Sequence, residues 1–159
     1  LLIADDGEKY SPEGIEESFT DQSVYISQCL LHNNQNPYTV ALIHPDRTAL
    51  LRHLKEKGLD PASEEAVESC IDLIDREVRE YRRSGKYGDM FPQRWVPASI
   101  GILADGFTLE NKMMNPTFKV VRPKVEEIHK DLFDFLYTPE AKTVTNQRNM
   151  EQIRKLLKA

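Results

Sequence analysis

The stretch that decides the fold is residues 24–43, VYISQCLLHNNQNPYTVALI. Residues 24–31 and 39–43 are rich in β-branched and other apolar side chains, as strands are. Residues 33–37 between them are dense in turn-forming residues. We therefore predict two antiparallel strands joined by a turn.

Helices are predicted downstream of this pair of strands. Asp46 can cap a helix that runs to about residue 57, where Gly58 ends it. The clearest element covers residues 62 to about 83, with acidic side chains in its early turns and arginines in its late turns, as the helix dipole favours. Its apolar side chains recur every three or four residues, which is the helical period. They are Val67, Cys70, Ile71, Ile74, Val78 and Tyr81.

Shorter elements are predicted upstream of the strands. Residues 1–4 and 8–10 flank an Asp-Gly pair, which is a strong signal for a small hairpin. A short helix capped by Ser11 should follow and turn Ile15 and Phe19 inward.

The C-terminal half completes an α+β layout. After an ordered loop at residues 85–97, a third strand is expected at 99–104 and an irregular segment at 107–118. Two further helices should begin near Pro123 and Gln147. The inward face of the first should carry Val125, Ile128, Leu132, Phe135 and Leu136. The expected fold is α+β, with a small N-terminal β-hairpin and a central sheet of about three strands flanked by helices.

Composition excludes several classes of protein. The chain has 159 residues, 21 basic and 26 acidic side chains and a net charge of −5. This balance argues against a nucleic-acid surface, because binding to phosphates requires an excess of cations. The longest apolar runs, such as residues 40–43, are far shorter than the roughly 20 residues of a membrane-spanning helix. Cys29 and Cys70 show neither disulfide nor zinc spacing, which favours a reducing, cytoplasmic setting.

Common catalytic and metal-binding motifs are missing. The four histidines are scattered without ligand spacing, so no metal site is predicted. The sequence has neither a nucleophile elbow nor a glycine-rich phosphate loop. Adjacent acids such as Glu16-Glu17 diverge by about 100° on a helix and cannot share a substrate atom.

Two polar segments carry residues that suit contact with a ligand. In residues 5–12, Gly7 allows another molecule to approach the backbone closely. In residues 110–119, Lys119 ends a proline-containing loop, and its flexible ammonium suits a phosphate or a carboxylate. Judged by their residues alone, the first segment is more simply a surface hairpin and the second carries an ordinary surface lysine.

The N-terminal residues have a recognisable order. Gly7, the apolar Tyr10, Pro12 and the pair Ile15-Glu16 resemble the segment just after the hinge of the AMP-forming acyl-CoA synthetases, which belong to the adenylate-forming superfamily.

The C-terminal half extends this resemblance. Residues 115–119, NPTFK, are similar to the Thr-Pro-Thr-x-Lys of the long-chain fatty acyl-CoA synthetase branch, and Arg122 continues the match. Residues 40–46 are similar to a core strand of the family and its following turn. The resemblance covers most of the chain, but only as the family's mobile C-terminal domain. Residues 1–159 are therefore expected to be that domain, beginning just past the hinge.

The resemblance implies a reaction in two steps. ATP, accompanied by Mg²⁺, and a fatty acid would form an acyl-adenylate, and CoA would then take the acyl group. Lys119 would be the catalytic residue of the first step, stabilising charge on the carboxylate and the α-phosphate. Gly7, Glu8 and Lys9 would line the channel for CoA in the second step. The required partner would be the protein's own N-terminal adenylation domain, so the isolated chain should be inactive.

The chain departs from the family pattern in three places. Asn115 stands where the branch has Thr, and Lys112 stands where glycine is common, so Lys112 is a rival for the active-site lysine. Residues 60–95 exceed the minimal domain and resemble an insertion built from the long helix, to which no role is assigned.

Two other functions remain open at this point. The chain could be a non-catalytic α+β module that binds another protein through its long helix and the loop around Trp95. It could also be the same domain of a ligase for a medium-chain or aromatic acid. A ligase predicts a hinge Asp or Lys and a phosphate loop upstream of Leu1. The protein is expected to be cytoplasmic, and this chain encodes no segment for peripheral association with a membrane.

Overall fold

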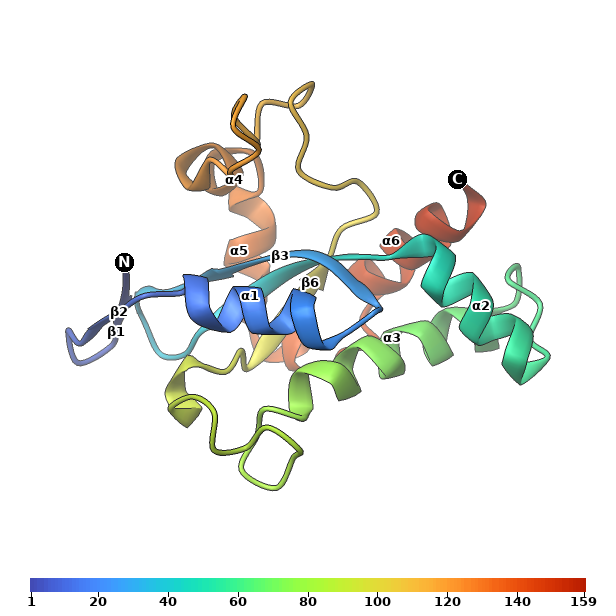
Figure 1. Cartoon of the computed structure of the whole chain (residues 1–159), viewed down its shortest axis with the longest axis horizontal. Helices are drawn as coiled ribbons and strands as arrows, with labels where there is room; N and C mark the ends of the chain where they lie inside the picture. The colour runs from blue at the N-terminus through green and yellow to red at the C-terminus, as the bar shows by residue number, and fades with distance from the viewer.

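The computed structural model describes residues 1–159 and contains six strands, six α-helices and two short 3-10 helices (Figure 1). The strands are β1 (Leu2–Ala4), β2 (Lys9–Tyr10), β3 (Ile26–His32), β4 (Asn34–Asn36), β5 (Val40–Pro45) and β6 (Ser99–Ile102). The helices are α1 (Glu13–Gln22), α2 (Arg47–Lys57), α3 (Glu64–Arg79), α4 (Arg122–Ile128), α5 (Lys130–Leu136) and α6 (Gln147–Lys158), with the 3-10 helices η1 (Gln93–Trp95) and η2 (Pro139–Lys142). The predicted α+β class is confirmed.

The predicted pair of strands forms the centre of the main sheet. β3 pairs antiparallel with β5, with Cys29 opposite Ile43 and Leu31 opposite Ala41. β6 pairs with β5 in parallel and gives the strand order β3-β5-β6. Because parallel neighbours need a long crossover, α2 and α3 lie in the segment that joins β5 to β6.

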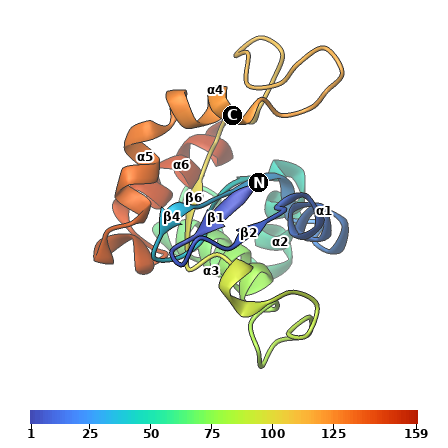
Figure 2. The same cartoon turned by 90° about the vertical axis from the view of Figure 1, so that its left-hand side faces the viewer.

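Both faces of this sheet are buried. Ala41 and Ile43 face a core of 28 buried residues, whereas the alternate residues Val40 and Leu42 face a smaller core of 10. This alternation follows from the two-residue period of a strand. Helices α1, α2, α3 and α6 cover the larger core, and α4 and α5 cover the smaller one. Figure 2 shows α1 and α2 on one side of the sheet and α5 on the other.

Helix α3 is part of the larger core. It packs against α2 and α6 and contributes a row of buried apolar side chains. The segment at residues 60–95 therefore supplies one wall of the domain, although the sequence alone suggested an appended insertion. The buried side chains of α3 are Ala66, Val67, Cys70, Ile71, Leu73, Ile74 and Val78.

Both predicted ends of α2 are confirmed, whereas α3 ends at Arg79, earlier than the predicted end near residue 83. The Asp46 side chain caps α2, and Gly58 ends it with a φ of +68°. The predicted cap at Ser11 is wrong. Pro12 occupies the cap position of α1, so the Ser11 hydroxyl is one residue too early and donates instead to the Glu13 carboxylate.

The N-terminal hairpin belongs to a second sheet. β1 pairs antiparallel with β2, as predicted, but β4 adds to β1 in parallel. The prediction of a plain turn at residues 33–37 is therefore wrong. Asn33 is buried, its carbonyl accepts from the Ile3 N–H at 3.0 Å, and its side chain accepts from the Asn36 N–H at 2.9 Å. Because of these polar contacts, residues 34–36 form an edge strand although turn-forming residues dominate their sequence.

The helix predicted from Pro123 is interrupted. It divides into α4 and α5 at His129, whose φ of −104° and ψ of 24° depart from helical values. Val125 and Leu136 are buried as predicted, but Ile128, predicted to face inward, is 46% exposed. Phe133, which was not predicted to face inward, is buried.

The loop at residues 85–97 is ordered by aromatic contacts, as predicted. Trp95 stacks on Tyr10 with ring centroids 5.2 Å apart and planes 13° apart, and Phe91 lies beside Trp95. These contacts tie the loop to the N-terminal hairpin.

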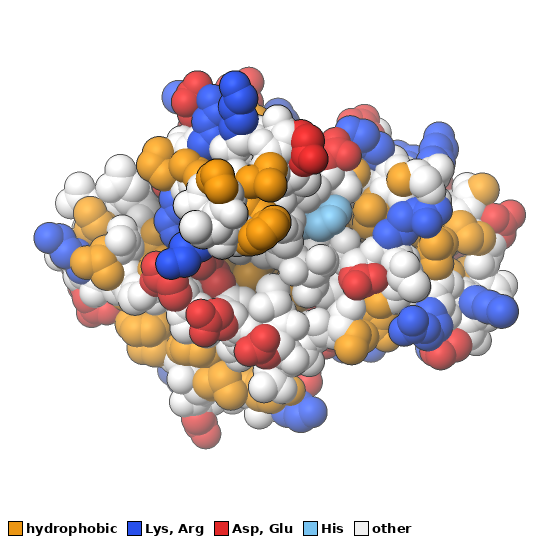
Figure 3. Space-filling view, turned by 45° about the horizontal axis from the view of Figure 1, so that its top comes forward, with side chains coloured by type: hydrophobic (Ala, Val, Ile, Leu, Met, Phe, Trp, Pro, Cys, Tyr) orange, Lys and Arg blue, Asp and Glu red, His pale blue; other side chains and the backbone are white.

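Three features of the composition have structural counterparts. Cys29 and Cys70 are both buried and unpaired, and burial raises the pKa of Cys70 to about 12. The face in Figure 3 carries acidic and basic side chains interspersed with apolar ones, without a block of cations. None of the helices combines the length and apolar character needed to cross a membrane.

Candidate functional site

Lys119 lies near the end of a short hairpin-like loop. Met114 and Val120 form an isolated antiparallel bridge at its base, and the Asn115 N–H donates to the Lys119 carbonyl at 2.8 Å. The Asn115 side-chain oxygen accepts from the backbone N–H groups of Thr117 and Lys119, each at 3.0 Å. Asn115 therefore organises the turn, as asparagine commonly does.

The tip of this loop is exposed. The Lys119 side chain is exposed and forms no salt bridge with the rest of the chain. Phe118 beside it is 72% exposed and has a φ of +62°. A left-handed backbone costs a bulky residue about 1–2 kcal/mol. Such strain clusters at functional loops, so the tip is suited to contact with another molecule.

Lys112 occupies a different part of the same loop. It is exposed and has a φ of +66°, and its N–H donates to the Leu109 carbonyl at 3.2 Å. Glycine adopts this conformation without strain, which explains physically why a glycine is expected here. Lys112 thus occupies a turn position whose backbone conformation suits glycine.

The C-terminal end of the loop is fixed to α1 and β3 by an ion pair. Arg122 donates to the Glu16 carboxylate, whose second oxygen accepts from the Leu31 N–H at 2.6 Å. Arg122 also donates to the Leu31 carbonyl at 3.4 Å. Burial raises the pKa of Glu16, and Arg122 opposes that rise. The base of the Lys119 loop is therefore held by a largely buried pair.

A groove of about 610 Å³ lies beside the loop. It runs between the loop on one side and α1 and β3 on the other, and Lys119 lies on its wall. The groove gives the ammonium access to a ligand that enters along α1. Its lining includes Glu13, Glu17, Gln28, Phe118, Lys119 and Arg122.

Gly7 lies in the turn between β1 and β2. Its φ is +90°, and a Cβ at this position would meet no atom within 4 Å, so the outer side of the turn is open. Glu8 directs its carboxylate toward Arg94 at 3.3 Å, and Lys9 is exposed on β2. The turn therefore leaves room for an extended ligand to approach its backbone closely.

The structure does not bring the two predicted segments together. The β1–β2 turn and the Lys119 loop protrude from different sides of the domain (Figure 1). Gly7, Glu8 and Lys9 form one group, and Lys119 lies with Arg122 in another. The two groups could contact one reaction centre only in different orientations of the domain.

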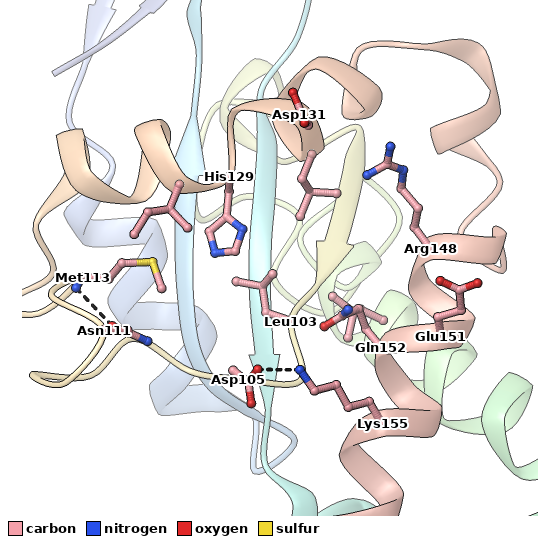
Figure 4. Close-up of a pocket in the computed structure, with 13 residues that line it drawn as sticks. Leu103, Asp105, Asn111, Met113, His129, Asp131, Arg148, Glu151, Gln152 and Lys155 are labelled. Atoms are coloured by element: carbon pink, nitrogen blue, oxygen red, sulfur yellow. Dashed lines mark hydrogen bonds and ion pairs between the residues drawn. The ribbon is translucent and has the colours of Figure 1, made fainter.

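A second cavity, of about 550 Å³, lies between the end of β6, the α4–α5 junction and α6 (Figure 4). The His129 ring points into it, and its Nε2 is buried without a hydrogen-bond partner. Lys155 pairs with Asp105 at 2.7 Å, and Arg148 and Glu151 add one charge of each sign. None of the predicted site residues lines this cavity.

Of the other three histidines, His32 lies 3.3 Å from the Glu126 carboxylate, and the other two make structural contacts. His44 Nδ1 lies 2.9 Å from the Leu103 carbonyl, and His53 Nε2 lies 3.1 Å from the Ser69 hydroxyl. No group of three His, Cys, Asp or Glu side chains is placed to hold a metal ion.

Sequence reasoning missed two contributors to these segments. Glu16 and Arg122 were matched to family motifs, but their pairing across 106 positions has no local signal. Arg94, which contacts Asp5 and Glu8, was not singled out at all. The one sequence signal for Arg94 is the cluster of acids around Gly7, which favours a nearby cation without indicating which residue supplies it.

Comparisons with known proteins found relatives by sequence and by fold. No protein-family model matches the chain. It is 26% identical over 142 residues to the peroxisomal long chain acyl-CoA synthetase 7 of Arabidopsis thaliana, covering 82% of this chain and 19% of the relative. It is 25% identical over 133 residues to the human long-chain-fatty-acid–CoA ligase 1, covering 83% of this chain and 19% of the relative. The chain thus spans about a fifth of the length of these relatives.

Solved structures show the same fold. The adenylation domain of a carboxylate reductase from Mycobacterium chelonae matches 86% of this chain with a TM-score of 0.67 and 20% identity, over 19% of its own length. The A-PCP didomain of a carboxylic acid reductase from Segniliparus rugosus, in complex with AMP, matches 89% of this chain with a TM-score of 0.61 and 22% identity, over 18% of its own length.

Fold and sequence together define the class of this protein. The chain has the fold of the C-terminal domains of adenylate-forming enzymes. By sequence it is similar to long-chain acyl-CoA synthetases and fatty acid–CoA ligases.

Proposed function

We propose that residues 1–159 are the mobile C-terminal domain of an AMP-forming long-chain fatty acid–CoA ligase. The observation that carries this proposal is the similarity to long-chain acyl-CoA synthetases over 82% of the chain. The exposed, unpaired Lys119 on a fixed loop supplies the chemistry that the proposal requires.

In the first half-reaction, a fatty acid carboxylate oxygen bonds to the α-phosphorus of ATP, and the bond to pyrophosphate breaks. Negative charge is then concentrated on the carboxylate and the α-phosphate. Lys119 is the catalytic residue that stabilises this charge, and its effect is largest where the partner domain excludes water. Because Lys119 has no carboxylate partner in the chain, its ammonium does not have to break a salt bridge first.

In the second half-reaction, the CoA sulfur bonds to the acyl carbon and AMP leaves. The domain then presents the turn around Gly7, and the open space at this glycine accepts the pantetheine arm, with Glu8 and Lys9 beside it. A side chain at Gly7 would project into that space. The separation of the two segments supports a reaction in which the domain is used in two orientations.

ATP and CoA contact mainly the N-terminal adenylation domain, which is the required partner, and Mg²⁺ accompanies ATP. The isolated chain is expected to be inactive for this reason. Its two buried, unpaired cysteines are compatible with a cytoplasmic enzyme. Any attachment to a membrane would be peripheral and would depend on other parts of the protein.

The test uses the enzyme that contains this domain. Lys119→Ala should reduce acyl-adenylate formation, measured by ATP–pyrophosphate exchange, by about 100-fold or more. The thioester step, started from preformed acyl-adenylate, should change much less. Lys112→Ala is the matched control, because it removes an exposed lysine from the same loop.

Three outcomes would contradict the proposal or parts of it. Equal activity of the Lys119 variant and the parent would contradict the role of Lys119, and a loss confined to Lys112→Ala would transfer that role to Lys112. A panel of long-chain, medium-chain and aromatic acids tests the acid class. If no acid supports pyrophosphate exchange, the non-catalytic interaction module is favoured instead.

A further inference from the structure

Arg94 connects η1 to the turn around Gly7. Its guanidinium donates to Asp6 at 3.1 Å, to Asp5 at 3.2 Å and to Glu8 at 3.3 Å. One side chain from the segment before β6 therefore reaches three carboxylates in a turn of four residues. No other basic side chain forms a salt bridge with this turn.

The turn needs this cation. Asp5, Asp6 and Glu8 crowd three negative charges around Gly7, and like charges at such short spacing repel one another. The Glu8 backbone N–H, followed by Arg94, holds the pKa of Asp6 below its ordinary value. The fork of N–H donors that arginine offers can contact all three carboxylates at once.

The backbone that carries Arg94 is itself fixed. The Thr39 hydroxyl donates to the Arg94 carbonyl at 2.9 Å, and the next residue, Trp95, stacks on Tyr10. Tyr10 in turn hydrogen-bonds to Thr39. Because these contacts tie η1 to β2 and to the start of β5, Arg94 acts from an anchored position.

The contacts of Arg94 leave the functional side of the turn free. They involve the carboxylates that flank Gly7, whereas the position of a Cβ on Gly7 has no neighbour within 4 Å. The backbone of the turn is therefore held in place while its outer side stays open. Such preorganisation favours close contact between a ligand and the backbone.

We propose that Arg94 is a positioning residue that fixes the turn at residues 5–8 for the thioester half-reaction. This inference rests on the proposed function and gives the segment at residues 60–95 a role. That segment presents the arginine that braces the turn through which CoA reaches the acyl-adenylate.

The test compares Arg94→Ala, Arg94→Lys and the control Arg79→Ala in the full-length enzyme. Arg79 is an exposed arginine that pairs with Asp75 at 2.8 Å within α3, away from the turn. Arg94→Ala should raise the KM for CoA and lower the rate of thioester formation by about tenfold, because a mispositioned contact costs catalysis even without direct chemistry. Pyrophosphate exchange should stay within about twofold of the parent. Arg94→Lys should recover only part of the loss, since one ammonium cannot bridge three carboxylates.

A structural readout on the 159-residue chain accompanies the kinetics. The amide NMR signals of Gly7 and Glu8 should shift and broaden in Arg94→Ala, while those of α3 should stay in place. Unchanged signals would overturn the inference, as would equal losses in both half-reactions.

Gly7→Val in the same assay separates this inference from the proposed function. If Gly7→Val impairs thioester formation and Arg94→Ala does not, the positioning role of Arg94 is wrong and the proposed function stands. If neither variant affects thioester formation, the role of the turn in the proposed function fails as well.

Discussion

Glu16 and Arg122, 106 positions apart in the sequence, form an ion pair that joins the first helix of the domain to the end of the Lys119 loop. Their side chains are only 12% and 28% exposed, and the Leu31 backbone bonds to both of them. The pair connects the two sequence motifs by which the chain resembles acyl-CoA synthetases. The position of the loop therefore depends on a residue from the opposite end of the chain.

Removal of either partner should destabilise the domain. Glu16→Gln and Arg122→Met should each lower the free energy of unfolding by roughly 2 kcal/mol, because each leaves a poorly solvated charge without its partner. The double variant should lose less than the sum of the single losses, since it leaves no unpaired charge. Urea denaturation measures all three. Lys130→Ala, which breaks an exposed pair with Asp134, is the control and should change stability by less than about 1 kcal/mol. Strict additivity would contradict the coupling.

A glycine at position 112 should stabilise the chain. Lys112 has a φ of +66° and an exposed side chain, so Lys112→Gly relieves left-handed strain and loses few contacts. The free energy of unfolding should rise by about 0.5–1 kcal/mol. This is the strain that is relieved, minus the cost of the greater conformational entropy of glycine in the unfolded chain. Thermal denaturation is the measurement. Glu110→Gly, at an exposed position without positive φ, should be neutral or destabilising, and an equal gain there would refute the strain argument.

Gly7 and Gly58 provide a matched pair of substitutions. Both have positive φ, +90° and +68°, and a Cβ at either position would meet no atom within 4 Å. Gly7→Val and Gly58→Val should therefore destabilise the chain similarly, by roughly 1–2 kcal/mol. Only Gly7→Val should impair thioester formation in the full-length enzyme. Similar kinetics for the two variants would mean that Gly7 serves the fold alone.

Stability should fall on mild acidification, in part through His129. Burial lowers the pKa of this imidazole below its ordinary value of 6.5. The unfolded chain then binds more protons than the folded one below about pH 6.5, so the stability contributed by neutral His129 is complete above that pH and is lost as the pH falls. His129→Gln should flatten the dependence of the unfolding free energy on pH between about 7 and 5. Urea denaturation at several pH values tests this, and an unaltered slope would contradict it.

Elements with strong local signals could be predicted from the sequence. The three strands of the main sheet, the cap at Asp46 and the glycine that ends α2 depend on neighbouring residues, and all are present. β4 could not be predicted, because its strand character comes from contacts with Ile3, far away in the sequence. The break at His129 also lacks a local signal, since neither glycine nor proline stands there.

The residues of the candidate site also divide into those with a local signal in the sequence and those without one. Gly7 and Lys119 could be singled out because glycine and lysine in polar loops have recognisable chemistry. Arg94 could not be singled out, and the partner of Arg122 could not be predicted, because any of several arginines could have supplied the same charge. Only the folded chain shows which arginine reaches which carboxylate.

The two cores on opposite faces of the main sheet also bear on how such a domain can diverge. The layer that carries α4, α5 and the root of the Lys119 loop is separated from the α3 layer by the sheet itself. Substitutions on the outer surface of α3 can accumulate over generations without repacking the layer beneath the lysine. The surface formed by α3 can thus evolve new contacts with other molecules. The layer that positions Lys119, and the chemistry that depends on it, stays the same.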